Sequence, residues 1–551
     1  MKKTTRESAK AGMNRRDFLR VGPAAGAVAL SARPLATAAA EALAAPRVPE
    51  FELEEITFLQ LQDGMKSGRL TARSVTEKYL ERIQQVDKQG PALNSVIELN
   101  PEALTIAEGL DRERQEKGPR GPLHGIPILI KDNIATHDRM KTSAGSLALA
   151  DCVPPRDAGV AAKLRAAGAV ILGKTNLSEW ANFRSSHSTS GWSGRGGLTL
   201  NPHALDRNPC GSSSGSGAAA SANLCAAAVG TETDGSVVCP SNANGLVGIK
   251  PTVGLISRAS IVPISHTQDT AGPMARTVAD AAALLGVLAG DDPADPATAA
   301  GIGHVERDYT RFLDPRGLAG ARLGVMRHFF GFNEHVDKVM NEALDALKRQ
   351  GAELIDPAEF PAKDRVDESE LTVLLYEFKA DLNAYLAALG PQAAIHSLKE
   401  AIDFNTHHRE REMPYFGQDI FEKAQEKGPV TDYAYQEALA RDYRLTRTEG
   451  IDAVMDKNKL DALVAPTGGP AWPTDLINGD HDSGGCSTPA AVAGYPHITV
   501  PAGFIFGLPV GISFFGRAWS ESTLIRLAYA FEQATRVRKP PRFLPSAELK
   551  S

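Results

Sequence analysis

The sequence predicts an α/β layered domain with a mostly parallel β-sheet. Segments with helical periodicity alternate along the chain with short apolar runs, and this alternation is typical of strands joined by helices. No repeat of fixed period is visible, so a repeat architecture is not indicated. The candidate strands lie at residues 126–130, 169–174, 321–326, 461–466, 497–504 and 510–516.

Two helices are predicted at the start of this domain, between Glu54 and Val86. Apolar residues recur there at helical spacing, and the pattern is broken at SGRLTARS, where Thr71 or Ser74 could cap the second helix. From about residue 335 to 460 the periodicity is again mainly helical, with few strand candidates. We expect this region to cover one face of the sheet or to shape the entrance of a site.

Between these helical regions, the chain supplies a strand, a helix and a second strand. The apolar run at 126–130 ends at Lys131 and is typical of a short buried strand. A helix at about 160–167 leads to the strand at 169–174. A span rich in glycine and serine follows at 185–217.

The first 45 residues differ in composition from the rest. The segment NRRDFLR (Asn14–Arg20) precedes a weakly apolar run and an alanine-rich stretch, which together resemble a twin-arginine export signal. The simpler alternative is a disordered basic terminus with a chance Arg-Arg pair. The apolar run is shorter than the about 20 residues of a membrane helix. We expect a leader at 1–45, export through the twin-arginine translocation machinery to a periplasmic or secreted location, and no stable membrane insertion.

The bulk composition excludes some classes of partner. The 551 residues carry a formal net charge of -6, which offers no basic footprint for a nucleic acid. We therefore expect a small-molecule or short-peptide partner. Five cysteines are too few for a disulfide framework, and their odd number leaves at least one unpaired. The pair His407–His408 has no further ligand beside it, so we expect no metal and no cofactor.

The span NPCGSSSGSG resembles a flexible linker, but an alanine-rich helix former follows it directly. A loop of this kind directs backbone N–H groups toward an anion, although the Lys-Ser/Thr ending of a nucleotide-binding loop is missing. Residues 211–215 also fit G-x-S-x-G, which would make Ser213 the nucleophile of an elbow. An elbow needs a preceding strand, and Pro202 and Pro209 argue against one.

Three separated segments supply a more complete set of catalytic groups. Lys131 ends GIPILIKD, Ser212 lies in CGSSSGSG, and Ser236 lies in TDGSVVCP. Serine is a poor nucleophile until a base takes its proton, and a lysine can be that base only if burial lowers its pKa from about 10.4. A lone lysine at a strand end is more often a solvated end cap. The two serine motifs favour the Ser-Lys variant of a catalytic triad instead.

These segments, together with TSAGS, GLVGIKPTVGLISR and DTAGPMARTV in the same order, resemble the amidase signature family. The resemblance runs from about Leu53 to Ala534. It implies one large amidase domain over residues 50–540. It also implies a mostly parallel mixed β-sheet that is covered by helices on both faces.

The resemblance also implies a role for each reactive residue. Ser236 would be the nucleophile, Lys131 the base, and Ser212 the hydroxyl that relays the proton between them. Asp269 and Arg276 would support the site from behind, although a structural ion pair explains them equally well. The oxyanion hole would come from the turn of Thr233, Asp234, Gly235 and Ser236.

Two positions depart from the commonest family pattern, which has Asp in place of Glu232 and Gly in place of Asp234. A carboxylate beside the oxyanion hole would oppose the developing charge unless it points away and accepts hydrogen bonds. The departure resembles the peptide-amidase-like branch of the family, as does VLLYEFKADLNAYL, which by resemblance lines the acyl-side pocket.

The implied function is an amide hydrolase that converts primary carboxamides, including C-terminal peptide amides, to acid and ammonia through a serine acyl-enzyme. One alternative is the glutamine-hydrolysing component of a tRNA-dependent amidotransferase, for which an export signal would be out of place. A catalytically silent binding protein is disfavoured by the intact Lys131, Ser212 and Ser236. Whether Cys210 and Cys239, which lie beside these serines, form a disulfide stays open at this level.

Overall fold

The computed structural model describes residues 46, 48–358 and 366–549. These residues belong to one compact unit, Ala45–Ser551. The leader expected at residues 1–45 lies outside the described part of the chain. Within the described ranges, no helix combines the length and the apolar character that a bilayer crossing requires.

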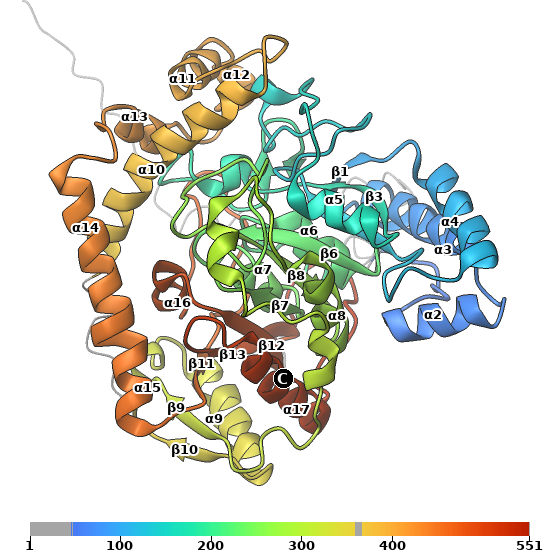
Figure 1. Ribbon diagram of the computed structural model, residues 1–551, viewed down its shortest axis with the longest axis vertical. Helices are drawn as coiled ribbons and strands as arrows, with labels where there is room; N and C mark the ends of the chain where they lie inside the picture. The colour runs from blue at the N-terminus through green and yellow to red at the C-terminus, as the bar shows by residue number, and fades with distance from the viewer. Residues whose placement is uncertain (1–45, 47, 359–365, 550–551) are drawn as a thin grey trace, which may run out of the picture. The chain divides into compact units, whose positions relative to one another are not determined.

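A single large β-sheet organises the domain (Figure 1). Its eleven strands lie in the order β1-β3-β2-β6-β8-β7-β12-β13-β11-β9-β10. Every apolar run that the sequence singled out is one of these strands. The strands are β1 (Val96–Leu99), β2 (Pro127–Lys131), β3 (Val170–Thr175), β6 (Ala227–Glu232), β7 (Val247–Lys250), β8 (Thr270–Ala275), β9 (Arg322–Val325), β10 (Glu353–Ile355), β11 (Ala462–Pro466), β12 (His497–Ile505) and β13 (Leu508–Phe515). The short pair β4 (Trp192–Ser193) and β5 (Gly197–Leu198) lies apart from them.

The mixed sheet is confirmed, but six of its ten described strand pairings are antiparallel, so it is not mostly parallel. Apolar runs do not report strand direction, which depends on the connections. Strands β12 and β13 are joined by Phe506 and Gly507, whose φ angles are 50° and 80°. Positive φ at both central residues is typical of a type I′ turn, which makes an antiparallel hairpin where a crossover helix would give a parallel pair.

Helices cover this sheet. Among their contacts, α8 packs on β8, α9 and α17 pack on β12, and α6 packs on β2 and β6. The helices are α2 (Phe58–Lys66), α3 (Ala72–Arg82), α4 (Ala103–Lys117), α5 (Gly159–Ala166), α6 (Ser214–Ser221), α7 (Val238–Ala243), α8 (Val278–Leu288), α9 (Glu334–Arg349), α10 (Asp367–Ala388), α11 (Leu398–His407), α12 (Arg409–Glu412), α13 (Asp419–Gln425), α14 (Tyr433–Tyr443), α15 (Asp452–Asn458), α16 (Thr488–Ala493) and α17 (Glu521–Thr535).

The predicted cap of the second helix is present. Thr71 is the N-cap of α3; its side chain accepts a hydrogen bond from the Ser74 backbone, and the Ser74 side chain accepts one from the Thr71 backbone. Such reciprocal bonds satisfy two N–H groups that a helix start leaves without partners. Both residues that the sequence proposed therefore take part in one cap.

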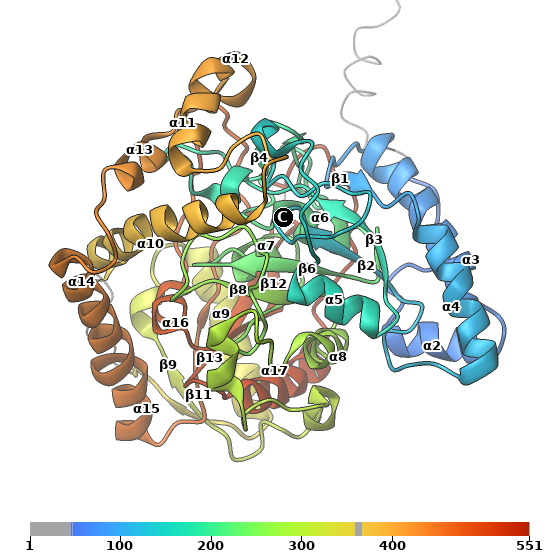
Figure 2. The ribbon, with the colours of Figure 1, turned by 45° about the horizontal axis from the view of Figure 1, so that its top comes forward.

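The described residues of the region at about 335–460 form helices and the loops between them, with β10 at the sheet edge as their one strand. Helix α10 contacts α11, α13 and α14, and Figures 1 and 2 show this group together on one flank of the sheet. Leu374 of α10 contributes to the wall of the cavity described below.

The segment NPCGSSSGSG, at the end of the Gly/Ser-rich span, leads into the buried helix α6 and is not a flexible linker. Every residue of α6 is buried, and its sequence, SGSGAAAS, contains only small side chains. A Cβ atom at Gly215 would lie 2.3 Å from the Ser95 carbonyl oxygen and 2.4 Å from that of Asn176. Small residues therefore allow α6 to approach the sheet closely, and the loop before α6 is held at the sheet with it.

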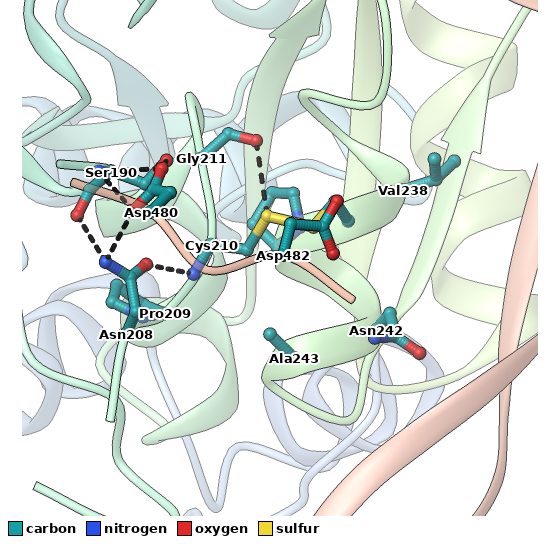
Figure 3. Close-up of a disulfide and its surroundings, with 12 residues drawn as sticks. Ser190, Asn208, Pro209, Cys210, Gly211, Val238, Asn242, Ala243, Asp480 and Asp482 are labelled. Atoms are coloured by element: carbon teal, nitrogen blue, oxygen red, sulfur yellow. Dashed lines mark hydrogen bonds between the residues drawn. A yellow bond between two sulfur atoms is a disulfide. The ribbon is translucent and has the colours of Figure 1, made fainter. Parts of the chain in front are cut away.

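A disulfide joins Cys210 to Cys239, with a Cα–Cα distance of 6.0 Å (Figure 3). Cys210 lies two residues before Ser212, and Cys239 lies three residues after Ser236, at the start of α7. The bridge ties the loop that enters α6 to the turn that enters α7. The pairing that the sequence left open is thus formed, and the other three cysteines, Cys152, Cys225 and Cys486, are free.

Candidate active site

The site is centred on Lys131 at the end of β2. Its side chain is fully buried, and Nζ donates hydrogen bonds to Ser212 Oγ at 2.7 Å and to Thr231 Oγ1 at 2.9 Å. Strands β2 and β6 are parallel, with Ile130 opposite Val229. This register brings the ends of both strands, and so Lys131 and Thr231, to the same edge of the sheet.

Burial lowers the pKa of Lys131 to about 7, although the carboxylates of Asp269 and Glu232 oppose the shift. Loss of hydration disfavours the ammonium form of a buried lysine. A substantial fraction of Lys131 is therefore a neutral amine near neutral pH, which is the form that can accept a proton.

Ser212 lies at the boundary between the loop and α6. The Gly211–Ser212 peptide is cis, and the Ser212 carbonyl accepts a hydrogen bond from Ser178 N at 3.1 Å. The hydroxyl faces Lys131 on one side, and the residue lines a cavity of about 430 Å³ on the other. Ser212 is thus the described group that connects the buried amine to the cavity.

Ser236 lines the same cavity. It follows Gly235, whose φ of 76° lies in the region that glycine adopts without strain. The Ser236 carbonyl accepts a hydrogen bond from Ser213 N at 3.2 Å, so the turn and the loop are joined by backbone as well as by the disulfide. The structure therefore brings Lys131, Ser212 and Ser236 together.

Ser213 has a structural position instead. Its hydroxyl donates to the Thr231 carbonyl at 3.0 Å and accepts from Thr231 N at 3.1 Å, and the residue is fully buried. No strand occurs within residues 199–213, whereas a nucleophile elbow requires one directly before the serine. The geometry disfavours the elbow alternative.

The turn at Thr233–Ser236 presents backbone donors to the cavity. The N–H groups of Asp234, Gly235 and Ser236 donate to no acceptor among the described residues. The next two N–H groups, of Val237 and Val238, are bound by Glu232 Oε2 at 2.7 and 3.0 Å. Glu232 thus stabilises the start of α7, and the preceding N–H groups remain available to a substrate oxygen.

The sequence requires the Asp234 carboxylate to point away from the oxyanion hole and to accept hydrogen bonds, and the structure meets part of this requirement. Its Oδ2 accepts a hydrogen bond from Thr488 Oγ1 at 2.6 Å, while its buried Oδ1 has no hydrogen-bond partner among the described residues. Burial raises the pKa of Asp234, and the hydroxyls of Ser487 and Thr488 counteract this. The carboxylate is held at one oxygen and unpaired at the other.

Asp269 and Arg276 do not act as a pair. Asp269 accepts hydrogen bonds from Thr233 Oγ1 at 2.6 Å and from the backbone of Ile264 and Ser265, so it holds the start of the turn at Thr233–Ser236. Arg276 binds carbonyl oxygens of Ala220, Cys225 and Ile56. The two residues flank opposite ends of β8, about 23 Å apart at strand spacing. Arg276 is therefore not part of the site, because its motif spans a whole strand.

Several residues of the site were not predicted. Asn133 Nδ2 donates to Thr231 Oγ1 at 3.0 Å and so supports the oxygen that binds Lys131; its place two residues after Lys131 was an available signal. Other parts of the cavity wall come from distant segments and have no motif. They are Phe183, Trp472, Asp480, Asp482, Ser487 and Thr488. Leu374 of α10 also lines the cavity, and it belongs to VLLYEFKADLNAYL, the segment that the resemblance placed at the acyl-side pocket.

A second cavity of about 420 Å³ shares Ala181, Thr233 and Ile264 with the first. At its wall, His266 faces Asp381 (Nδ1 to Oδ2, 2.9 Å) and Glu377 (Nε2 to Oε1, 3.3 Å). Among the described residues, these three could hold a metal ion by their spacing. Burial opposes protonation of His266, but the two carboxylates raise its pKa overall.

Known proteins resemble the chain over most of its length. The Amidase family model matches residues 74–525. The native peptide amidase from Stenotrophomonas maltophilia is 51% identical, with a TM-score of 0.85, over 90% of this chain and 100% of that one.

Two curated relatives are also similar. A protein from Arabidopsis thaliana named as a probable amidase is 44% identical over 504 residues, 90% of this chain and 93% of that protein. A glutamyl-tRNA(Gln) amidotransferase component from Halorhodospira halophila is 32% identical over 497 residues, 88% of this chain and 98% of that protein. The chain therefore belongs to the amidase family and is an amide-hydrolysing enzyme.

Proposed function

We propose that the protein hydrolyses primary carboxamides, including the C-terminal amide of short peptides, through an acyl-enzyme on Ser236. One observation carries the proposal. A buried lysine is hydrogen-bonded to Ser212, and Ser212 and Ser236 line one cavity. Similarity to a peptide amidase supports the choice of substrate.

In the acylation step, Ser236 Oγ attacks the amide carbonyl carbon. Its proton passes to Ser212 Oγ while the Ser212 proton passes to Lys131 Nζ, so the base acts across the relay. The carbonyl oxygen gains negative charge and accepts hydrogen bonds from the turn that contains Gly235. Because these donors are already oriented, their stabilisation needs little rearrangement.

Collapse of the tetrahedral intermediate breaks the C–N bond. Lys131, now an ammonium, returns the proton through Ser212 to the leaving nitrogen, and ammonia departs. A water molecule then attacks the acyl ester, with Lys131 again as base, and releases the carboxylic acid from Ser236. The cycle restores every proton and needs no cofactor.

Burial around the relay supports a small leaving group. Lys131 is fully buried and Ser212 is 1% exposed, so little space surrounds the atoms that protonate the leaving nitrogen. An NH₂ group needs almost no room there, whereas the remainder of a cut peptide chain would. The site thus favours primary amides over internal peptide bonds.

The amidotransferase alternative is less well supported. The amidotransferase component shares fewer identical residues with the chain than the peptide amidase does. No observation on the site favours an ammonia channel over hydrolysis, and we retain the hydrolase as the proposal.

The substrate is tested with a short peptide supplied both as its C-terminal amide and as its free acid. Conversion of amide to acid raises the mass by about one dalton because NH₂ is replaced by OH. We expect this gain, with release of ammonia, from the amide and no change in the acid. Mass spectrometry reads both outcomes. Internal fragments from either peptide, or no ammonia from any primary amide, would refute the assignment.

The role of Lys131 is tested by Lys131→Met, which removes the amine and keeps most of the volume. We expect kcat to fall about 10³-fold or more, because an essential base is lost. In the wild type, kcat/KM should decline as the pH falls through about 7, since protonated Lys131 cannot accept a proton.

Lys174→Met is the matched control. Lys174 is also fully buried, and its Nζ binds the Ile134 carbonyl and Thr142 Oγ1 rather than a site serine. A folded Lys174→Met protein, checked by circular dichroism, should keep kcat within a few-fold. Comparable activity of folded Lys131→Met and wild type would exclude Lys131 as the base.

We also propose that the protein is exported through the twin-arginine pathway to the periplasm or the medium. Arg15 and Arg16 in the leader motif support this, as does a disulfide beside the site, because disulfides persist in oxidising compartments. The test is cell fractionation of the wild type and of Arg15→Lys/Arg16→Lys, combined with thiol alkylation. The wild type should be outside the cytoplasm with Cys210 and Cys239 protected, and the variant retained with both reactive. Normal export of the double variant would contradict the proposal.

A further inference from the structure

The ionisable side chains that line the cavity at Ser236 are all acidic. Asp234, Asp480 and Asp482 contribute to its wall, and the described lining residues include no Lys, Arg or His. Lys131 lies behind Ser212, and His481 faces Asp475 at 3.3 Å. Charge of one sign in a concave, partly apolar space focuses the potential on whatever enters it.

The innermost carboxylate is Asp234, two residues before the nucleophile. Its Oδ1 is buried and has no hydrogen-bond partner among the described residues. This oxygen is closed to solvent, so Asp234 acts on the cavity from behind its wall and does not itself contact a ligand there.

Asp480 is held in one position by hydrogen bonds. Ser190 donates to it from N at 3.0 Å and from Oγ at 2.6 Å, and Asn208 Nδ2 donates at 3.3 Å (Figure 3). Trp472 Nε1 also donates to Asp480, at 3.3 Å. These donors hold the carboxylate in place at the cavity wall. Because they are uncharged groups, they orient the negative charge of Asp480 without neutralising it.

Asp482 lies at the mouth and is exposed. Its hydrogen bond from Gly484 N to Oδ1 is a long one, at 3.3 Å. The exposed side chain can therefore meet a group that enters the cavity. Burial raises the pKa of Asp480, and a bound cation would favour its charged form.

From this arrangement we infer that the enzyme selects cationic amides, those that carry an ammonium or guanidinium group within reach of Asp482 and the inner carboxylates. The inference rests on the proposed hydrolysis at Ser236 and specifies its substrate class. The cation can be the amino terminus of a short peptide amide or a basic side chain. Both sources present the same N–H donors, and charge-assisted hydrogen bonds are roughly twice as strong as neutral ones.

The same charge acts on the product. Hydrolysis converts a neutral amide to a carboxylate inside a wall of like charge, which disfavours its retention. A peptide with a free C-terminal carboxylate is repelled before it binds. The acidic wall therefore favours binding of the amide over binding of the carboxylate product, which carries one more negative charge. No residue needs to contact the product carboxylate for this discrimination.

The experiment measures ammonia release from matched N-acetylated amides: acetyl-lysinamide, acetyl-norleucinamide and the amide of acetyl-glutamic acid. We expect kcat/KM to be about tenfold higher for the lysine than for the norleucine compound, the size of a charge-assisted contact, and lowest for the glutamic acid compound. Norleucinamide with a free amino group reports the other source of the cation. The advantage should appear mainly in KM and shrink in about 0.5 M salt, which screens exposed pairs.

Asp482→Asn should reduce the lysine-to-norleucine ratio several-fold. The control is Asp475→Asn, which removes a charge from the same loop; Asp475 binds Ile477 N and Asn478 N and does not line the cavity. This control should leave the ratio unchanged. Equal wild-type rates for lysine and norleucine, or an equal loss in both variants, would overturn the inference. If no neutral or charged amide releases ammonia, the proposed function fails instead.

Discussion

The burial of the Lys131 amine is the constraint on which the site depends. In water this group is an ammonium at neutral pH, but at the closed end of β2 its pKa falls to about 7. The ladder between β2 and β6 places Thr231 beside it, and Asn133 holds the Thr231 hydroxyl from the other side. A buried amine with fixed neutral partners can be protonated and deprotonated at little cost, which is what a base in an enclosed site requires.

Small residues and short connections position the two serine segments around the buried amine. The loop with Ser212 can reach Lys131 because α6 has no large side chain and lies directly against the sheet. The disulfide and the Ser213–Ser236 backbone hydrogen bond then hold the second serine segment against the first. Glu232 binds the N–H groups at the start of α7 and thereby leaves the preceding turn to face the cavity.

The sequence was informative where a local pattern has a local cause. Strand positions, the Thr71 cap and the meeting of Lys131 with Ser212 follow from apolar runs, capping chemistry and a family resemblance. The prediction of a mostly parallel sheet was wrong because an apolar run does not report the direction of a strand. The prediction that Arg276 supports the site was wrong because DTAGPMAR extends along the whole of β8. Trp472, Asp480 and Asp482 could not be found, since only the fold brings their loop to Ser236. The export signal remains a prediction.

The identity of the nucleophile is the central claim, and covalent trapping tests it most directly. The protein is treated with a fluorophosphonate, and the modified residue is located by peptide mass spectrometry in the wild type, Ser236→Ala and Ser213→Ala. The two serines are close in space but differ in role, so each variant is the control for the other. The account predicts one adduct, on Ser236, which is absent from Ser236→Ala and present in Ser213→Ala. An adduct on Ser213, or undiminished labelling of Ser236→Ala, would contradict it.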